Sequence, residues 1–588
     1  MLNLKKNFKI IPIVILMGLV PLIVRMKKVS YPYFDFIWSV NMKSGYDIFA
    51  YYKSMIIIFT GAILLMRVLY LYLTHRIDFK NKYIILLLMS AFFIVLAYAF
   101  SDYQYIASFG FKDRFEGSFT LLSYIVITLY ILLEYNSHED IDKTMKYVLF
   151  FIGLMSLIGI GQYFKLDVFH SDWGKLIFSP KDKIDDLVFK SQLGRVYMTL
   201  YNPNYVGTYF VLMGPLMANL FINSKKRWKE LLFLLIYIAL VFSLAGSQSR
   251  GGFLGALVAL PLLCFLNVFL NKSLTFKNKI VKIPLIIIIF LVVFLAHGNN
   301  VSRMNTIFED TEEKIPLESI YTMEEKLYIK YDNKEYFIKE EENGFVLYEG
   351  KLMDYSQKLV KLNNKIKVLP WWLTIKTLNL EEGDHTFIVS IEDTIALPFG
   401  HTSEGMRFIN KKAYYVPLKK VPALYVFGKE SLGSGRVYIW SRSIPLLMDT
   451  LLIGNGADTY PLYFPQTDYI GKFKGFGDYK KLSETIVDKP HNLYLQMGIN
   501  TGVISLLIYL GINFLLIFDL FQFIKNGFHL EKAISFIAII TGYGITMLFN
   551  DSAVVVSTIY WVIIGLSMVL VGLDHKKNSI NFFSPFID

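Results

Sequence analysis

Arg250 stands in the motif Ser-Gln-Ser-Arg-Gly-Gly between two long apolar runs, Leu231–Gly246 and Phe253–Leu270. A fixed charge between segments of hydrocarbon length is costly at membrane depth, so it is a candidate functional group. Its guanidinium is a fork of donors suited to phosphate oxygens. Gly251 lets the backbone approach a ligand closely, and the helix expected after Ser249 offers N-terminal amides to an anion. An arginine that reaches lipid phosphates from a helix end explains the motif equally well.

A second arginine and a histidine occur in motifs far along the chain. Arg436 stands in Gly-Arg-Val-Tyr-Ile-Trp, and Arg442 follows on the same amphipathic stretch. His491 comes after Pro490 and directly before Asn492, where we expect a helix to begin. A histidine at the mouth of a helix bundle can act as a general base near neutral pH. A surface arginine and a hydrogen-bonded loop histidine are the commoner explanations of such motifs in isolation.

The motif Tyr-Asn-Pro-Asn-Tyr is a turn and helix-start signal. Its asparagines are Asn202 and Asn204, and a purely structural role accounts well for them. Arg195 lies a few residues earlier and is a weaker candidate for a second phosphate contact.

Several classes of chemistry find no support in the sequence. It has no Walker loop, no His-Glu-x-x-His motif and a single cysteine, Cys264, so nothing indicates ATP hydrolysis, zinc or a disulfide. Much of the net charge of +12 lies in short loops, where the positive-inside rule explains it better than nucleic-acid binding. Acidic residues are nearly absent within the apolar runs, and Asp551 lies at the end of one, which argues against an ion-coupled transporter. The arginines and the histidine suit a phosphate-bearing substrate that enters from the lipid.

The elements that must position these residues are membrane-spanning helices. Hydrophobic residues make up 54% of the chain and charged residues 18%, whereas soluble proteins carry about 25% charged residues. We therefore predict an all-α polytopic membrane protein with about twelve transmembrane helices. The apolar runs are Ile10–Val24, Ser54–Leu73, Tyr83–Phe100, Phe119–Leu133, Tyr147–Phe164, Tyr205–Ile222, Leu231–Gly246, Phe253–Leu270, Ile283–Ala296, Thr501–Phe521, Ile534–Phe549 and Val554–Leu573.

Basic residues in the short loops orient the predicted helices. Lysines just before the first run place the N-terminus in the cytoplasm. Threading the helices from there puts the basic cluster Lys225–Lys229 inside and the Arg250 turn outside, together with the loop Lys165–Asn204 and the long polar region. The segment Arg25–Lys53 is the exception, because its basic residues then fall outside.

A polar region of about 200 residues separates the ninth and tenth runs. Alternating stretches within it, such as Lys326–Tyr348, predict strands, and we read Val301–Val426 as a β-sandwich-like insertion. An amphipathic helix that lies on the membrane surface is expected from Gly435 onward. The predicted domains are residues 1–300 with helices 1–9, 301–426 as an extracytoplasmic β-rich insertion, 427–500 as an extracytoplasmic loop that carries Arg436 and His491, and 501–588 with helices 10–12.

An ordered set of motifs resembles the O-antigen ligase and O-antigen polymerase superfamily. Each motif is weak alone, but their order around one long outer loop is fairly specific. The resemblance covers roughly residues 201–502 apart from the β-rich insertion, which typical members lack. The motifs are Tyr201–Tyr209, Ser247–Gly255, Arg436 with Trp440, Pro445-Leu446, Leu452–Gly456 and His491–Gln496 followed by Gly502.

This resemblance implies a glycosyltransferase with a GT-C-like fold in the bacterial plasma membrane. Such an enzyme passes a glycan from an undecaprenyl-diphosphate carrier to an acceptor hydroxyl at the outer face, with inversion and without nucleotide sugar, metal or cofactor. Arg250 and Arg436 would hold the diphosphate, and His491 would lie beside the acceptor hydroxyl as base or orienting group. The resemblance does not separate ligation from polymerisation.

Motifs and resemblance together predict Arg250, Arg436 and His491 as catalytic residues. The expected partners are a lipid-linked glycan donor, a glycan, lipid or protein acceptor and the bilayer, with no nucleic acid. The predicted substrate-binding residues are Arg195, Asn202, Asn204, Ser249, Gly251, Arg442 and Asn492.

Other functions stay open at this point. A flippase for lipid-linked glycans would need polar residues within its helices, and apart from Arg67 the runs contain few. A protein O-oligosaccharyltransferase would use the same donor. A membrane anchor that displays a glycan-binding β-sandwich would use the insertion and not the arginines.

Overall fold

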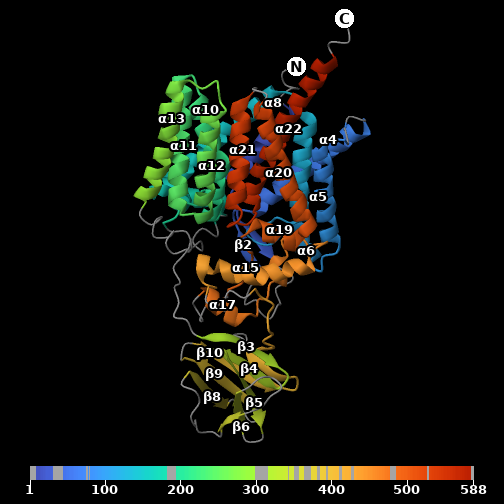
Figure 1. Ribbon diagram of the computed structural model, residues 1–588, viewed down its shortest axis with the longest axis vertical. Coiled ribbons are helices and arrows are strands. Elements are labelled where there is room, and N and C mark those ends of the chain that lie inside the picture. Colours follow the sequence, from blue (N-terminus) through green and yellow to red (C-terminus); the bar gives the residue numbers. More distant parts are fainter. Residues whose placement is uncertain are drawn as a thin grey trace.

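The structure is a computed structural model in which a bundle of long helices stands at one end and two β-sheets at the other (Figure 1). Helices α15 and α17 lie between these two parts. The residues that the structure describes are 8–30, 44–74, 77, 80–179, 181, 194–297, 316–341, 344–349, 357–362, 372–379, 385–392, 395–409, 414–424, 429–476, 485–525 and 529–583.

Nine helices in this described part of the chain are long and apolar enough to cross a membrane. They are α4 (Tyr51–Leu73), α5 (Lys82–Ala99), α8 (His138–Tyr163), α10 (Pro203–Asn223), α11 (Arg227–Ser247), α12 (Arg250–Phe269), α13 (Phe276–Ala296), α20 (Val503–Lys525) and α22 (Val554–Phe583).

The other three predicted runs are also helical, but their helices are shorter. They form α7 (Ser118–Glu134), α21 (Leu530–Thr546) and a first segment built from α2 (Ile11–Val14), the π-helix η1 (Ile15–Leu19) and α3 (Val20–Leu22). A polytopic, mostly helical membrane protein is thus confirmed. The total of twelve spans stays a prediction.

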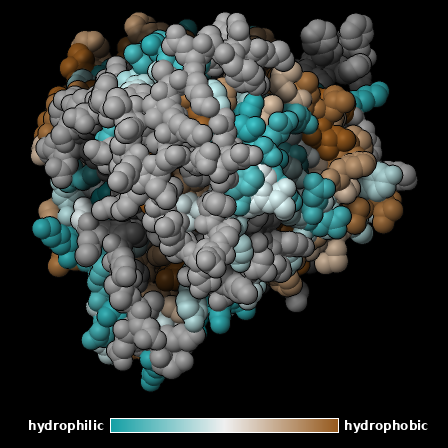
Figure 2. Space-filling view, turned by 90° about the horizontal axis from the view of Figure 1, so that it is seen from below, coloured by the Kyte–Doolittle hydropathy of each residue, from teal (hydrophilic) through white to brown (hydrophobic). Residues whose placement is uncertain are grey.

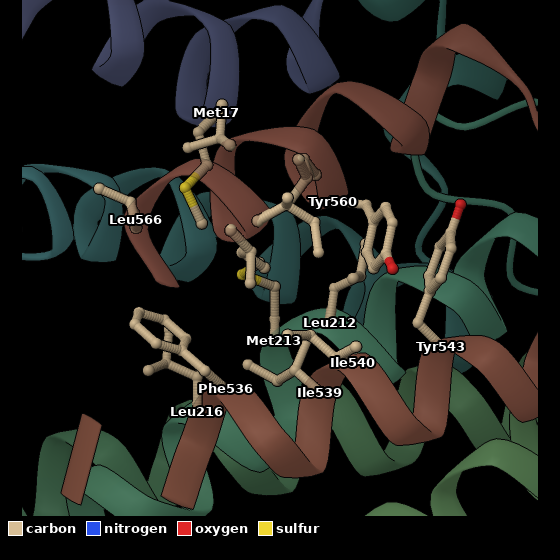
Figure 3. Packing of buried hydrophobic residues seen from close by; sticks show 14 of the residues in the cluster. Met17, Leu212, Met213, Leu216, Phe536, Ile539, Ile540, Tyr543, Tyr560 and Leu566 are labelled. Atoms are coloured by element: carbon tan, nitrogen blue, oxygen red, sulfur yellow. The ribbon is translucent and has the colours of Figure 1, made fainter. Parts of the chain in front are cut away.

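The helices α10 and α22 form the centre of the bundle. Their most apolar stretches are 94% buried inside the protein, compared with 28% for α4 and α13. Figure 3 shows α10, α21 and α22 interdigitating through Leu212, Met213, Phe536, Ile540 and Tyr560. Helices buried on all sides in this way carry continuous apolar sequence, and more peripheral helices present much of their apolar surface to lipid.

One close helix crossing places Arg250 at the end of this core. A Cβ atom on Gly252 would lie 2.3 Å from the Cα of Gly207, so the backbones of α12 and α10 are in contact. Only glycines permit such an approach. Arg250 lies two residues before the contact and is thereby fixed beside the start of α10.

The ends of the bundle differ in charge and in what covers them. The Arg250 turn contacts the segment that leads into α15, and we call this end the α15 end. The start of α8 and the basic loop between α10 and α11 lie at the opposite end (Figure 1). There Lys282 pairs with Glu230 at 2.5 Å, and Lys9 pairs with Asp140 at 2.7 Å. The Arg250 turn and the basic cluster Lys225–Lys229 therefore lie at opposite ends of the bundle.

Among the described residues between α13 and α15, ten strands form two antiparallel five-stranded sheets. Each sheet is a meander with neighbouring strands paired in sequence order. Seen from this end, hydrophobic residues gather towards the edges of the view, and the described residues nearer its middle are mostly hydrophilic (Figure 2). The strands are β3 (Leu317–Met323), β4 (Lys326–Tyr331), β5 (Lys334–Glu341), β6 (Gly344–Glu349) and β7 (Gln357–Leu362) in one sheet, and β8 (Leu373–Asn379), β9 (His385–Ile391), β10 (Ile395–Thr402), β11 (Gly405–Ile409) and β12 (Tyr415–Val416) in the other.

The apolar core between the sheets also anchors them to the helices. Period-2 alternation places Leu327, Ile329 and Phe387 in this core. Tyr469 and Ile470 of α17 (Tyr469–Phe476) belong to the same cluster. Because α17 also packs on α15, the sheets are tied to the helix that covers the bundle.

Short elements complete the α15 end. The basic segment after the first run forms β1 and β2 there, and Lys53 is buried with its ammonium donating to the carbonyl of Thr199 at 2.6 Å. The short elements are β1 (Lys27–Ser30), β2 (Ser44–Asp47), α6 (Gln104–Phe109), η2 (Val168–His170), α9 (Asp172–Phe178), α16 (Tyr460–Tyr463) and α19 (Leu493–Thr501).

The helix α15 spans Leu432–Asp449, but its regular part begins at Arg436. Gly433, Ser434 and Gly435 have φ values of 66°, 62° and 78°, so the chain makes a left-handed turn before the helix. On one side of the helix Met448 is 71% exposed and Ile444 is 38% exposed. This exposure fits the amphipathic, interfacial helix predicted from the sequence.

Candidate active site

Arg250 begins α12 and points towards the turn before α15. Gln248 has a positive φ of 53°, which ends α11 sharply. Ser249 then caps α12, because its Oγ accepts a hydrogen bond from the Gly252 amide at 3.2 Å. The Arg250 guanidinium donates from Nη1 to Ser434 Oγ at 3.1 Å. Two segments separated by 184 residues therefore meet at one arginine.

Arg436 approaches the same turn from the other side. Its Nη1 donates to the carbonyl of Gly433 at 3.0 Å, one residue from the serine that Arg250 contacts. Both guanidiniums thus lie beside the left-handed turn, and each belongs to the first residue of a regular helical stretch. Helix N-termini add partial positive charge, so the two arginines and two helix ends form a region suited to an anion.

His491 lies on the loop that enters α19 and faces Asp551. The distance from its Nδ1 to Asp551 Oδ1 is 3.6 Å, which is longer than a hydrogen bond but within ion-pair range. Asp551 Oδ2 in turn accepts a hydrogen bond from the Tyr205 hydroxyl at 2.6 Å. The imidazole is 26% exposed and the carboxylate 4%. Nδ1 of His491 therefore faces this buried carboxylate.

The loop before His491 is held in place by the helix bundle and by α15. Trp440 of α15 donates its indole N–H to the carbonyl of Pro490 at 2.8 Å. Asn492 caps α19 by accepting from the Leu495 amide at 3.0 Å and donates to the carbonyl of Leu548 at 3.1 Å. His491 itself has a φ of 50°, a backbone conformation that non-glycine residues rarely adopt.

A network of buried charges lies directly behind the histidine. The Lys489 ammonium is 3.6 Å from Asp551 Oδ2 and 3.9 Å from Asp488 Oδ2. Arg114, which is 1% exposed, donates to Asp458 at 2.6 Å and to Asp488 at 2.9 Å. Buried charges are retained where they are paired and hydrogen-bonded, and this network fixes the carboxylate that faces His491.

Burial and charge set the protonation states in this group. Burial lowers the pKa of His491 below its usual 6.5, and the charges of Lys489 and Arg436 lower it further. Burial alone would raise the pKa of Asp551, but Lys489 and His491 outweigh it and hold the pKa of Asp551 well below its usual range. The pKa of Lys489 is raised, because Asp551 and Asp488 outweigh the opposing effect of burial. At neutral pH the site therefore holds a neutral imidazole between an ammonium and a carboxylate.

The remaining predicted residues near the arginines act through the backbone. Asn202 caps α10 by accepting from the Asn204 amide at 2.9 Å. The Asn204 carbonyl accepts from Asn550 at 3.3 Å, and a Cβ atom on Gly251 would lie 3.2 Å from the Asn550 side chain. Asn550 therefore joins the starts of α10 and α12 next to Asp551. Direct substrate contacts by Asn202, Asn204, Ser249, Gly251 and Asn492 stay predictions.

Two predicted substrate-binding arginines are engaged in contacts within the protein. Arg195 donates from Nε at 2.9 Å and from Nη2 at 2.6 Å to the carbonyl of Ser247, so it caps the end of α11. Arg442 forms an ion pair with Asp468 at 2.8 Å, on the side of α15 that faces α17. Arg195 thus supports the turn that carries Arg250, and Arg442 belongs to a different surface.

Several residues of this site were not predicted from the sequence. Lys489 stands two residues before His491, and Asp551 is the single acid near the end of its apolar run. These two sequence positions could have indicated that Lys489 and Asp551 belong to the site. The partnership of Tyr205 with Asp551 and that of Arg114 with Asp488 join residues hundreds of positions apart, which no local pattern indicates.

The comparison with known families bears on this part of the chain. Residues 385–510 match the model of the O-antigen ligase family. Residues 385–510 thus form an O-antigen ligase-like segment. The match confirms the resemblance predicted from the motifs, and it includes Arg436 and His491 but not Arg250. No curated protein and no solved structure matches the chain.

Proposed function

We propose that this O-antigen ligase-like protein is a membrane glycosyltransferase. It would take a glycan from an undecaprenyl-diphosphate carrier and pass it to an acceptor hydroxyl at the outer face of the bacterial plasma membrane. The observation that carries the proposal is the convergence of Arg250 and Arg436 on one turn, with His491 on the adjacent loop. The family match and the many apolar helices support it.

The two arginines would stabilise the leaving group. In the transfer, the acceptor oxygen forms a bond to the anomeric carbon and the bond from that carbon to the diphosphate oxygen breaks. The carrier diphosphate leaves with the electron pair and gains negative charge. Guanidiniums and helix N-termini that are already in place stabilise that developing charge without further reorganisation.

His491 would receive the proton of the acceptor hydroxyl. Its lowered pKa keeps the imidazole neutral at pH 7, as a base requires. Asp551, held by the Tyr205 hydroxyl, faces Nδ1 and would stabilise the imidazolium after proton transfer. In this mechanism Lys489 keeps Asp551 ionised, and all four groups come from this chain.

The structure offers the flippase alternative little support. Arg67 and Asp519 are charged residues within apolar runs, and both are paired, Arg67 with Glu134 at 2.8 Å and Asp519 with Lys82 at 2.6 Å. Arg250, Arg436 and Lys489 lie instead at the α15 end. A second function is therefore not proposed.

The acceptor class is tested with the purified chain in liposomes that contain a defined undecaprenyl-diphosphate glycan. Glycan, lipid and protein acceptors are offered separately, and the product is detected by mass spectrometry. We expect one acceptor class to be glycosylated, with loss of the reaction in His491→Ala. Carrier-linked glycan that crosses the bilayer without transfer to any acceptor would overturn the proposal.

The acid limb of the transfer rate is expected to lie below pH 6.5, because burial lowers the pKa of the base His491. Protonation of His491 in the unfolded chain also lowers stability as the pH falls below 6.5. In Lys489→Gln one charge that lowers this pKa is removed, so the limb should move to higher pH. The measurement is the pH profile of the transfer rate, with thermal unfolding recorded in parallel and Lys272→Gln, an exposed lysine outside the site, as the surface control. An acid limb that does not move in Lys489→Gln contradicts this assignment of the base.

A further inference from the structure

A concave site lies on the opposite side of α15 from Arg250 and Arg436. It is a cavity of about 450 Å³ between β3, the chain segment 419–424, α15 and α17. Trp440 faces the bundle through Pro490, whereas Arg442 faces this cavity through Asp468. Figure 1 shows α15 between the bundle and α17, with the sheets beyond. The volume is within the range of small-molecule and short-oligomer sites.

Charged side chains that are largely buried form the polar part of this groove. Arg442 pairs with Asp468 at 2.8 Å, and their side chains are 14% and 12% exposed. Lys474 donates to the carbonyl of Glu318 at 3.2 Å. Glu318 in turn pairs with Lys330 at 2.5 Å. These contacts hold donors and acceptors in fixed positions around the cavity.

Glu430 is the group that points to a ligand. It lines the cavity and is 7% exposed. Within the part of the chain that the structure describes, no hydrogen bond or ion pair ends on its carboxylate, although its charge is near enough to raise the pKa of Lys474 against the stronger lowering effect of burial. Its carboxylate lines the cavity without a donor among the described residues, and hydrogen bonds to a charged group are among the stronger ones. A ligand with hydroxyl donors would supply them.

The rest of the lining is apolar, and its rim is basic. Ile320, Val421 and Ile470 form part of the wall. Tyr321 adds an aromatic ring, which stacks on Tyr328 with the ring centroids 5.1 Å apart. Lys419 and Lys420 lie exposed at the rim. Aromatic and aliphatic walls of this kind accept the C–H face of a ring, and the rim keeps the entrance wet.

The mixture of charges selects the chemical class of the ligand. Glu430, Asp468 and Glu318 would repel a phosphate or another anion. Arg442, Lys474 and the rim lysines would repel a cation. Neighbouring hydroxyl groups match the pattern, because each hydroxyl both donates and accepts. One hydroxyl group can donate to Glu430 while the neighbouring hydroxyl accepts from Arg442 or Lys474.

We propose that this groove binds a short saccharide segment, with Glu430 accepting from its hydroxyls and Tyr321 beside a sugar ring. Binding itself does not depend on the proposed transfer reaction. Assignment of the saccharide to the donor glycan or to a glycan acceptor does rest on the proposed function. In either case α15 would contact the glycan on one face through Arg442 and would lie beside the proposed diphosphate site of Arg250 and Arg436 on the other.

The test uses the full chain in nanodiscs and fragments of two to six sugars cut from the host's own surface polysaccharide. Binding is measured by saturation-transfer NMR and titration. We expect Glu430→Gln to weaken binding about 10- to 100-fold, as expected for loss of hydrogen bonds to a charged group. Ala423→Trp, which fills the groove without altering Glu430, should also abolish binding. Glu324→Gln, an exposed carboxylate on the β3–β4 turn, is the control, and thermal unfolding verifies that every variant is folded.

Several results would overturn this inference. One is fragment binding that is unchanged in both Glu430→Gln and Ala423→Trp. Another is displacement of the fragments from the groove by pyrophosphate or by a lysine-rich peptide, which would assign it to a charged ligand. Arg250→Ala should bind the fragments normally although it loses glycan transfer. A failure of the proposed transfer reaction can therefore be distinguished from a failure of saccharide binding in the groove. During transfer, inhibition by free fragments that competes with the lipid-linked glycan assigns the groove to the donor, and competition with the acceptor assigns it to the acceptor.

Discussion

Replacement of Arg250 with alanine is expected to reduce glycan transfer by about 100- to 1,000-fold, the loss typical of one preorganised group that stabilises developing charge. The effect should fall on kcat more than on KM, because the interaction strengthens as the diphosphate leaves. Arg250→Lys keeps the charge but loses the planar fork that donates to Ser434, so we expect only partial activity. The measurement is steady-state transfer with a defined lipid-linked donor.

The matched control for Arg250 is Arg227→Ala, an exposed arginine in the basic cluster at the opposite end of the bundle. It should retain the rate of the unmodified chain. The double variant Arg250→Ala with Arg436→Ala separates two possibilities. If both arginines hold one diphosphate, the combined loss should be clearly smaller or larger than the product of the single losses. Purely multiplicative effects, or normal transfer by Arg250→Ala, would show that the two do not act on one group.

Replacement of Arg114 with methionine is expected to lower the free energy of unfolding by about 3–5 kcal/mol, because it leaves Asp458 and Asp488 without their buried partner. Methionine retains much of the volume, so loss of packing contributes little. Transfer should fall as well, since Asp488 belongs to the loop that carries Lys489 and His491. The measurements are thermal unfolding and denaturant titration in detergent, followed by the transfer assay.

Arg407→Met is the matched control for Arg114, because it also removes an arginine from an ion pair. Its partner Glu404 lies outside the membrane helices and is 80% exposed, and loss of an exposed ion pair costs only about 0–1 kcal/mol. Equal destabilisation by the two variants would contradict the view that the Arg114 network anchors the site. Unchanged stability of Arg114→Met would also contradict this view.

The position of α15 links these expectations. One face of the helix contacts the loop before His491 through Trp440, its start lies beside Arg250, and its other face lines the groove through Arg442. Because α17 inserts Tyr469 and Ile470 into the core between the sheets, movement of the sheets would be transmitted to α15. A glycan bound in the groove would therefore act on the same helix that holds Arg436.

The membrane helices were predictable from sequence because their signal is local. A run of apolar residues of bilayer length can satisfy its backbone hydrogen bonds only as a helix, and all twelve runs are helical. The start of the regular part of α15 near Gly435 follows from its amphipathic pattern, and the caps at Asn202, Ser249 and Asn492 follow from residue type. The family could be recognised because motif order persists along the chain even where single motifs are weak.

The site itself depends on which distant segments meet, and this was decided by packing. The sequence alone indicated that Arg250 is a candidate functional residue, that His491 lies just before a helix and that strands interrupt the helical pattern. It did not determine that Asp551 and Tyr205 stand behind His491, that Arg195 caps α11, or that Arg442 turns away towards α17. Those outcomes depend on the contact of α10 with α12 at Gly207 and Gly252 and on the left-handed turn before α15. Charges separated by hundreds of residues are paired only when the helices close around them, so their partners belong to the tertiary structure.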